Sequence, residues 1–502
     1  MSRKNRNNPD AMLPPPVRRA RALERAAMLM NQGKFDEAET VLRKDVPNPS
    51  KDADALRMRG SIAERQQRPR EAMDFAERSL KIRRDPNTML LIGQLHARNG
   101  DVEGAMDQCR EALELEPNHL PSTFMLISAC LENQRIDEAA KLLAPLIGTY
   151  QEIPELNRRI KVMQAQLLME QDQSEEACGI LDEVLEQDGI HPREQRSILF
   201  LKTRASVRSD KPEEAMAAAT SAQSISRPMF VPRRNTEMID AMLEIWSRDN
   251  MQNFPLCENT SENPVFIAGM PRSGVFLMNR ILSAHPAIGS TQEETSIEKF
   301  SARISEEADI DLPAPECFGR IQAPQWNTTA ENYLRTCAAK NPDGAARTLN
   351  CFMGNNRLAG LISRLFPKSR MIHVIRDPRD VAISTYMSGY NGKTHPWTTR
   401  LDWIIDAWMN SQRLMAHWSE HLDLPILEVR YEQLVEKPEE EVRRILDFLD
   451  VEWNPGCLEF HQDHPPSQPL GKEHLGKPLN TATIGRHAPY ADQFKSIDIP
   501  KY

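Results

Sequence analysis

The chain has 502 residues, which exceeds one ordinary domain, so at least two domains are expected. Apolar residues make up 40% of the chain and charged residues 27%, a balance typical of globular proteins and not of disordered or fibrous ones. The net charge of −9 argues against a dedicated nucleic-acid-binding protein, although it says nothing about local patches.

The N-terminal stretch, residues 1–21, is basic but lacks the apolar core of a secretory signal. We interpret it as a disordered basic tail, with a nucleic-acid- or lipid-binding arm as the alternative. No stretch of the chain approaches the ~20 consecutive apolar residues of a membrane span. The 8 cysteines show no C-x-x-C spacing, which favours reduced thiols over disulfides or a zinc site and makes the cytoplasm the expected location.

Residues 22–230 repeat with a period near 34. The marker is an alanine that follows an acidic or small residue, and successive markers are 34, 33, 34, 38 and 38 residues apart. These markers are Ala38, Ala72, Ala105, Ala139, Ala177 and Ala215. Turn-forming residues such as Asn31 to Lys34 and Asn99 to Asp101 precede them. The pattern predicts helix–turn–helix units and resembles the tetratricopeptide repeat.

Such units bury their apolar faces only against their neighbours, so they stack into a curved, all-α solenoid. A small residue at the marker position lets two helices pack closely. The concave groove of a solenoid favours binding of a protein or peptide partner. The alternative is a spacer or a dimerisation arm, which would make a second copy of the chain the partner. Nothing in the sequence decides between these.

Residues 231–263 form the predicted connection between domains. Residues 235–246 have helical spacing, and residues 249–263 are a polar run that we take as the domain boundary. The remaining residues, 264–502, form the second predicted domain.

The stretch 264–282 predicts an anion-binding turn. Residues 265–268 indicate a buried strand, the segment 269–274 (GMPRSG) has the glycines and proline of a tight turn, and apolar residues from Leu277 onward have helical spacing. A helix N-terminus after such a turn directs free N–H groups at an anion, and Arg272 adds a positive charge. An ATP- or GTP-binding P-loop is excluded, because Val275 and Phe276 replace the required lysine and hydroxyl. An ordinary strand-to-helix turn remains the alternative.

Three further stretches carry polar motifs. Residues 369–390 contain a predicted strand, 371–375, followed by the sequence RDPRD and a helix. Residues 424–435 read LPILEVRYEQLV and precede a predicted helix over 438–449. Residues 471–487 (GKEHLGKPLNTATIGRH) are basic. If these stretches bind no ligand, Tyr431 is a core residue at a strand end, and the basic stretch 471–487 is a solvated loop.

Together with the turn, these motifs resemble the PAPS-dependent sulfotransferases, whose donor is 3′-phosphoadenosine 5′-phosphosulfate, and the K-P-x-N sequence at 477–480 is similar to that of protein-tyrosine sulfotransferases. The resemblance covers residues 264–487. It implies an α/β, P-loop-like domain with a parallel sheet, PAPS as cosubstrate and no metal. The residues implied for nucleotide binding are Arg272, Ser273, Gly274, Val275, Phe276, Arg376, Ser384, Tyr431, Lys477 and Arg486.

The same resemblance implies a catalytic base. Protein-tyrosine sulfotransferases carry an E-E-T sequence with a catalytic glutamate before the threonine, so Glu294 is the candidate and Glu293 the second choice. The spacing from His285 is one residue longer than in that family. Two solvated glutamates that open a helix are the alternative.

The sequence departs from the family at two places. The hydroxyls of the family's P-R-S-G-T-T loop are replaced by Val275 and Phe276, and the lysine that stabilises the leaving oxygen aligns with Cys351. Two functions are therefore predicted. One is sulfuryl transfer from PAPS to a hydroxyl of a peptide, carbohydrate or small molecule. The other is a catalytically impaired pseudo-sulfotransferase that acts as a scaffold or nucleotide-binding partner protein.

Overall fold

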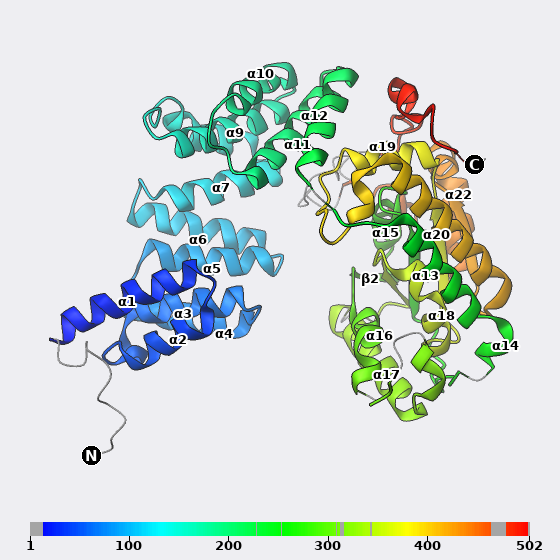
Figure 1. Cartoon of the computed structure of the whole chain (residues 1–502). Coiled ribbons are helices and arrows are strands. Elements are labelled where there is room, and N and C mark those ends of the chain that lie inside the picture. Colours follow the sequence, from blue (N-terminus) through cyan, green and yellow to red (C-terminus); the bar gives the residue numbers. More distant parts are fainter. Residues whose placement is uncertain are drawn as a thin grey trace, which may run out of the picture. The chain divides into compact units, whose positions relative to one another are not determined.

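The computed structural model describes residues 14–226, 228–252, 254–307, 309–311, 316–341, 344–462 and 478–499. Contacts divide the chain into two compact units, Met1–Gln171 and Asp172–Tyr502. The described part of the first unit is all helical, and the second contains a five-stranded parallel sheet with helices around it (Figure 1). The predicted fold class, a helical repeat region followed by an α/β domain, is confirmed.

The first unit consists of paired helices. They are α1 (Pro15–Asn31), α2 (Phe35–Lys44), α3 (Ala53–Arg65), α4 (Pro69–Ile82), α5 (Pro86–Arg98), α6 (Val102–Leu115), α7 (Leu120–Glu132), α8 (Ile136–Leu143) and α9 (Pro154–Glu170), with the 3₁₀ helices η3 (Pro49–Lys51) and η4 (Ala144–Leu146). The predicted tail, residues 1–21, overlaps α1. Residues 1–13 lie outside the described residues. Helix α1 starts at Pro15, seven residues before the predicted start of the repeat at residue 22. Proline suits the first turn of a helix, and burial of Ala22 and Ala26 anchors this one.

A left-handed residue precedes each marker alanine. The φ angles at these positions lie between 55° and 83°. The residues are Gly33, Gln67, Gly100, Gln134, Asp172 and Asp210, and their spacing of 34, 33, 34, 38 and 38 equals that of the marker alanines. A left-handed residue after a helix lets later amides bond back to its last carbonyls, as Lys34 N does to Leu29 O at 2.9 Å. The repeat therefore rests on a recurring turn as well as on a recurring small side chain.

All 6 marker alanines are at most 1% exposed, as close helix packing requires. Glycine serves the same purpose on the facing helix. A Cβ atom at Gly60 would lie 3.2 Å from the Ala72 carbonyl oxygen, and one at Gly93 would lie 3.1 Å from that of Ala105. Helix pairs thus approach backbone to backbone at the marker positions.

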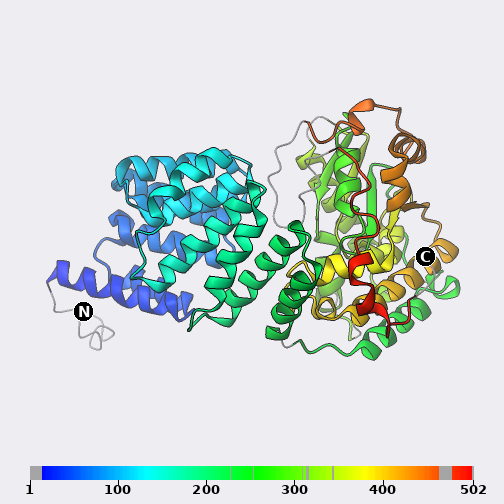
Figure 2. The same cartoon turned by 90° about the horizontal axis from the view of Figure 1, so that it is seen from above.

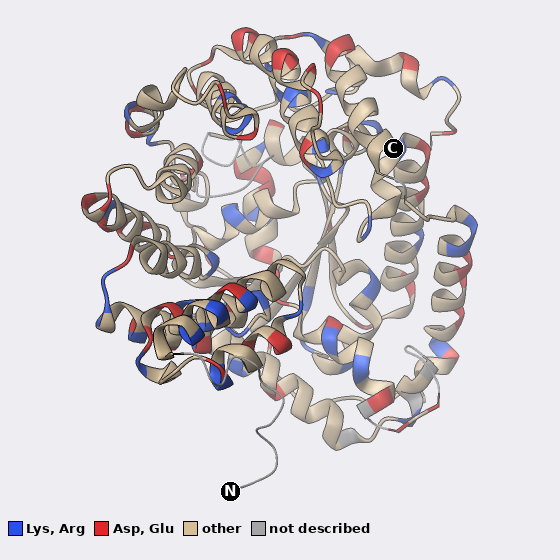
Figure 3. Cartoon of the chain, turned by 60° about the vertical axis from the view of Figure 1, so that its left-hand side comes forward, with Lys and Arg blue, Asp and Glu red and all other residues tan. Residues whose placement is uncertain are grey.

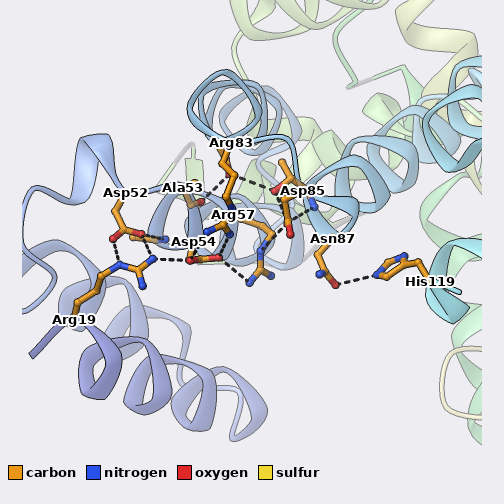
Figure 4. A network of polar contacts seen from close by, with 12 residues as sticks. Arg19, Asp52, Ala53, Asp54, Arg57, Arg83, Asp85, Asn87 and His119 are labelled. Carbon is orange, nitrogen blue, oxygen red and sulfur yellow. Dashed lines mark hydrogen bonds and ion pairs between the residues drawn. The ribbon is translucent and has the colours of Figure 1, made fainter. Parts of the chain in front are cut away.

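Polar contacts tie α1, α3 and α4 together (Figure 4). The Arg19 guanidinium donates to the carboxylates of Asp52 and Asp54, and Arg83 donates to Asp54 at 2.6 Å. Asp52 also caps α3 by accepting from Ala55 N at 3.0 Å. The Arg19 side chain is 37% exposed, and exposed ion pairs add little to stability. We therefore expect this network to fix how the helices align more than to stabilise them. Positive and negative side chains are interspersed along the repeat helices (Figure 3).

The second unit is built on a sheet with the order β2-β3-β1-β4-β5, and all its neighbouring strands are parallel. The strands are β1 (Pro264–Gly269), β2 (Ile288–Gln292), β3 (Arg347–Asn350), β4 (Arg370–Ile375) and β5 (Ile426–Arg430). The predicted strands are thus present. Chain connections leave β1 and β4 in opposite directions along the sheet, so the crevice for a ligand is expected where these two neighbouring strands end.

Helices cover both faces of this sheet. The helices of the second unit are α10 (Ser174–Leu185), α11 (Pro192–Arg208), α12 (Pro212–Ile225), α13 (Pro232–Ile245), α14 (Arg248–Met251), α15 (Val275–Ser283), α16 (Ser296–Glu307), α17 (Ala323–Lys340), α18 (Asn355–Leu365), α19 (Pro378–Tyr386), α20 (Leu401–His421), α21 (Tyr431–Glu436) and α22 (Pro438–Phe448), with η5 (Glu316–Arg320), η6 (Pro396–Thr399), η7 (Pro455–Cys457) and η8 (Ala488–Phe494). On β1, Phe266 and Ala268 pack with residues of α17, α18 and α20, whereas Val265 and Ile267 pack with residues of α15 and α22. This alternation buries the strand completely.

The last helices of the predicted repeat region, α10 to α12, belong to this second unit. Ala219 of α12 is fully buried in a cluster with Ala382 and Ile383 of α19 and with Tyr490. The predicted connection, residues 231–263, begins with α13. Trp246, which follows α13, packs against α18, because a Cβ atom at Gly360 of α18 would lie 2.5 Å from the Trp246 ring. The polar run that follows also contacts this unit, since Cys257 N donates to Arg364 O at 2.9 Å.

All 8 cysteines are free thiols and are buried. Within the described residues, no helix combines the length and apolarity needed to cross a membrane. The described side chains likewise contain no group of three or more His, Cys, Asp or Glu residues placed to hold a metal ion.

The marker alanines generate a stability prediction. Replacing Ala105, which is 1% exposed, by leucine should destabilise the repeat by ~1–3 kcal/mol, because the added atoms have no space between the helices. Urea unfolding followed by circular dichroism measures this loss. The matched variant is Ala97→Leu on the exposed side of α5, which should stay within ~0.5 kcal/mol of the parent. Equal stability of the two variants would contradict close packing at the marker.

Candidate functional site

Residues 270–274 join β1 to α15, and we call them the phosphate turn after the role that the sequence predicts for them. Its backbone is left-handed at Arg272, with φ of 71°, and at Gly274, with φ of 110°. Gly274 is the N-cap residue of α15, so the first amides of that helix have no carbonyl partner within it. The Ser273 hydroxyl is buried and has no hydrogen-bond partner among the described residues. Both features suit a turn that binds an anion.

Close packing around the turn requires its glycines. A Cβ atom at Gly274 would lie 2.7 Å from the ring of Tyr431, and one at Gly269 would lie 2.7 Å from the Ser273 hydroxyl oxygen. The first distance shows that Tyr431, at the start of α21, lies directly against the turn. Two stretches separated by more than 150 residues therefore meet here.

Arg376 directly follows β4 and joins several parts of the site. Its Nη1 donates to the carbonyl oxygen of Arg272 at 3.0 Å, and its Nη2 donates to that of Thr483. The guanidinium carbon lies 4.5 Å from the centre of the Tyr431 ring. The side chain is buried, and its Nε has no hydrogen-bond partner among the described residues. The predicted proximity of the turn and the end of β4 is thus present, and it follows from the register that pairs Gly269 with Val374.

Ser384 lies in the last turn of α19, and its side chain meets that of Arg272. Its hydroxyl accepts a hydrogen bond from Nε of Arg272 at 2.7 Å. The side chain is 8% exposed, so this contact is sheltered from water. A guanidinium from the turn after β1 and a hydroxyl from α19 are therefore adjacent.

The C-terminal segment, residues 478–487, is attached to α19 by Asp380. This carboxylate is completely buried and accepts from Gly485 N at 2.8 Å and from His487 N at 2.9 Å. It also lies 3.6 Å from Nη2 of Arg376. Figure 2 shows the C-terminal part of the chain, in red, running beside α19, in yellow. Near the middle of the segment, the hydroxyls of Thr483 and Tyr431 are hydrogen-bonded.

The structure brings together most of the residues that the sequence predicts for nucleotide binding. Arg272, Ser273, Gly274, Arg376, Ser384 and Tyr431 form one connected cluster through the contacts above. Val275 is the buried first residue of α15, and Phe276 packs against the core on that face. Arg486 belongs to the C-terminal segment and acts electrostatically on Tyr490, whereas Lys477 lies outside the described residues. The nucleotide-binding roles of all these residues stay predictions.

The candidate base Glu294 is turned toward the start of α16. Its Oε2 accepts from Ser296 N at 2.9 Å and from the Ser296 hydroxyl at 2.6 Å. Its backbone carbonyl accepts from the Asn350 side chain at 3.0 Å. The carboxylate is thus oriented by its own helix end, which is the arrangement expected of a helix-capping residue as well as of a positioned base.

Glu293 is exposed, and its charge acts on a different neighbour, Tyr390. Burial raises the pKa of the Tyr390 hydroxyl, the positive charge of Arg272 lowers it, and the negative charge of Glu293 raises it further. The charges of Arg272 and Glu293 thus act on Tyr390 in opposite directions.

Cys351, at the position of the family lysine, is enclosed in the core. It follows β3, is completely buried and packs with Val265 and Leu349. Its amide donates to the Gln292 carbonyl at 2.9 Å, which fixes the backbone. A cysteine side chain in this place supplies no positive charge to a ligand.

Sequence analysis did not single out three residues that organise the site. Asp380 was visible as the second aspartate of RDPRD, and a carboxylate in a buried helix is a signal of a structural partner. Thr483 and Tyr390 carried no local signal, because their importance depends on contacts with residues more than 50 positions away.

Comparison with known proteins agrees with this arrangement. Residues 264–455 match the model of the "Sulfotransferase family", and residues 23–88 match that of the "Tetratricopeptide repeat". Residues 65–146 match "Anaphase-promoting complex, cyclosome, subunit 3".

Individual relatives were also found. An uncharacterized protein of Aquifex aeolicus is 23% identical over 92% of this chain and 62% of its own length. A protein-tyrosine sulfotransferase of Drosophila melanogaster is 26% identical over 44% of this chain and 46% of its own length. The chain thus spans about half to two thirds of these relatives. A sulfotransferase domain from the Synechococcus PCC 7002 olefin synthase is 20% identical, covers 50% of this chain and 93% of that one, and has a TM-score of 0.34.

The role assigned to Asp380 can be tested. Asp380→Asn should speed amide exchange in residues 478–487 by about tenfold or more, because two amides and a buried guanidinium lose a charged partner. Hydrogen–deuterium exchange with mass spectrometry measures the change. Asp402→Asn, whose carboxylate pairs with Arg400 at the surface, is the matched control and should leave that segment unchanged. Equal exchange in both variants would show that other contacts hold the segment.

Proposed function

We propose that this protein, whose repeats are followed by a sulfotransferase-family domain, transfers a sulfuryl group from PAPS to the hydroxyl of a peptide, carbohydrate or small molecule. The observation that carries the proposal is the contact between the two predicted phosphate sites. Arg376 Nη1 lies 3.0 Å from the Arg272 carbonyl, and Arg272 in turn donates to Ser384. A nucleotide with anionic groups on both sides of its ribose needs guanidinium and hydroxyl donors grouped in this way.

The residues present fit such a ligand. The Ser273 hydroxyl and Arg376 Nε are buried donors without a hydrogen-bond partner among the described residues, and such groups are costly unless a ligand or water satisfies them. Glycine at positions 269 and 274 lets the Ser273 hydroxyl and the Tyr431 ring pack against the backbone on either side of the turn. We assign the 5′ side of the nucleotide to residues 272–276, and the 3′-phosphate to Arg376 and Ser384. Tyr431, Lys477 and Arg486 would contact the remainder.

Bound PAPS would supply the activated sulfuryl group and a phosphate leaving group. The chain's own contribution is then to hold the donor, to stabilise negative charge and to accept a proton from the acceptor hydroxyl. The α15 amides and Arg272 perform the first two tasks. Glu294 is positioned for the third by its bonds to Ser296, and Glu293, whose charge acts on Tyr390 beside Arg272, is the second choice.

A specific observation also favours the second candidate function, a catalytically impaired nucleotide-binding protein. The position of the leaving-group lysine holds Cys351, which is completely buried. Loss of one donor to the transition state typically costs ~10²–10³ in rate, or roughly 3–4 kcal/mol. Nucleotide binding survives such a loss, because it depends on the other side of the site.

Tetratricopeptide repeats are typical of protein–protein interaction. For this chain we assign them a protein or peptide partner. A second copy of the chain is the alternative occupant.

Nucleotide binding generates the first functional prediction. Adenosine 3′,5′-bisphosphate, the product of sulfuryl transfer, should stabilise the protein by ~2.7 kcal/mol at 100 times its dissociation constant. Thermal melting measures the shift. Arg272→Ala should remove it, and Arg400→Ala, which deletes an exposed guanidinium, should retain it. Arg376→Ala should remove it as well, but that variant also loses contacts within the fold. No shift with the parent protein would contradict both candidate functions.

The candidate base generates the second functional prediction. Glu294→Gln should retain the melting shift and lower transfer of radiolabelled sulfate from PAPS by ~10²–10⁴, because the amide accepts no proton. Glu293→Gln is the matched comparison, and the larger loss identifies the base. If the parent protein shows the melting shift but transfers sulfate to no acceptor, the impaired nucleotide-binding protein is the candidate function that remains.

A further inference from the structure

The segment between α19 and α20, residues 386–399, is held by helices of the predicted repeat region. Arg196 of α11 donates to the carbonyl oxygen of Tyr390 at 2.6 Å and to that of Gly389 at 3.5 Å. Its guanidinium carbon lies 4.6 Å from the centre of the Phe200 ring, one turn later on the same helix. A rigid, forked cation supported by an aromatic ring thus fixes two successive peptide groups.

Glycines allow this close approach. Gly389 has φ of 54°, and a Cβ atom there would lie 3.1 Å from the Phe200 ring. A Cβ atom at Gly392 would lie 3.3 Å from the Ser226 side chain, just after α12. The segment is therefore shaped to fit α11 and α12, and it does not simply pass over them.

Gln223 of α12 joins the two ends of the segment. Its side chain is 5% exposed and donates from Nε2 to Tyr386 O at 2.7 Å and to Thr398 O at 3.4 Å. The Tyr386 carbonyl belongs to the last turn of α19, where carbonyl groups lack partners within the helix. One buried amide thus caps α19 and closes the segment.

The same segment reaches the candidate site from the other side. Ser388 donates its hydroxyl to the carbonyl of Ser384, the residue that accepts from Arg272. Trp397 packs against the buried cluster that contains Met270, the first residue of the phosphate turn. Tyr390 is influenced by the charges of Arg272 and Glu293. Residues 386–399 therefore lie between the phosphate turn and the pair α11–α12.

We infer that Arg196 and Gln223 are positioning residues of the nucleotide site, so that the last helical pair of the repeat region is a working part of that site. The inference rests on the proposed function. Arg196 holds the backbone at Gly389 and Tyr390, directly after Ser388, whose hydroxyl bonds to the Ser384 carbonyl. Gln223 fixes the end of α19 two residues after Ser384. A displacement of α11 or α12 changes the site through these contacts, and an occupied site restrains both helices.

Calorimetric titration of the full chain with adenosine 3′,5′-bisphosphate tests this. Arg196→Ala should weaken binding by about tenfold, within the usual range of coupling between sites, and Arg196→Lys, which keeps one charged donor, should recover part of the loss. Lys202→Ala on the same helix, which removes a contact to Asp182 of α10, should bind within twofold of the parent. A structural role alone would lower the melting temperature of Arg196→Ala and leave its affinity unchanged, and that result overturns the inference.

Hydrogen exchange of the unmutated chain gives a second test that does not depend on a variant's folding. Saturating bisphosphate should slow exchange in residues 386–399 and in residues 196–206 of α11. Protection that stops at α19 overturns the inference while leaving the proposed function intact. A parent protein that binds no bisphosphate overturns both.

Discussion

The arrangement of the site depends on one buried cation. Arg376 is 5% exposed, and its charge is balanced by the Asp380 carboxylate at 3.6 Å, by the carbonyls of Arg272 and Thr483, and by the Tyr431 ring at 4.5 Å. An uncompensated buried charge costs several kcal/mol, so these partners are required together. They come from the turn after β1, from α19, from the C-terminal segment and from α21. Assembly of the site and burial of the cation are therefore the same event.

The sequence motifs predict one role for Arg376, which is contact with the 3′-phosphate. Its buried contacts indicate a second role, which is to hold neighbouring segments together. Two nitrogens of Arg376 already bond to backbone carbonyls, and only Nε has no hydrogen-bond partner among the described residues. Arg376 thus organises the segments around the candidate site, while Arg272, Ser273 and the amides of α15 are its donors on the side of the turn. Substituting Arg376 tests folding and binding at once, whereas substituting Arg272 tests mainly binding.

Features that arise from neighbouring residues were predictable. The repeat period, the strands and the turn after β1 all follow from local patterns of apolar residues and glycine. Gly33 and Gly100 occupy two of the recurring left-handed positions, and Gln67 and Gln134 occupy two others. At the glutamines only the repeat spacing indicates a left-handed backbone. The roles of Asp380 and Cys351 and the division of the chain at Gln171 depend on long-range packing, which no local pattern encodes.

The departures from the family pattern are unevenly distributed. Val275 and Phe276 replace the hydroxyls of the family's P-R-S-G-T-T loop, and Cys351 replaces the lysine that stabilises the leaving oxygen. The contacts of Arg272 with Ser384 and of Arg376 with the turn are present. Groups that act only in the transition state contribute to rate, while groups that bind the nucleotide equally throughout contribute to affinity. The Ser273 hydroxyl is a buried donor without a hydrogen-bond partner among the described residues, and such a group is costly unless a ligand or water satisfies it. If the proposed function holds, the replacement of the leaving-group lysine by Cys351 therefore lowers the rate of transfer more than it weakens nucleotide binding.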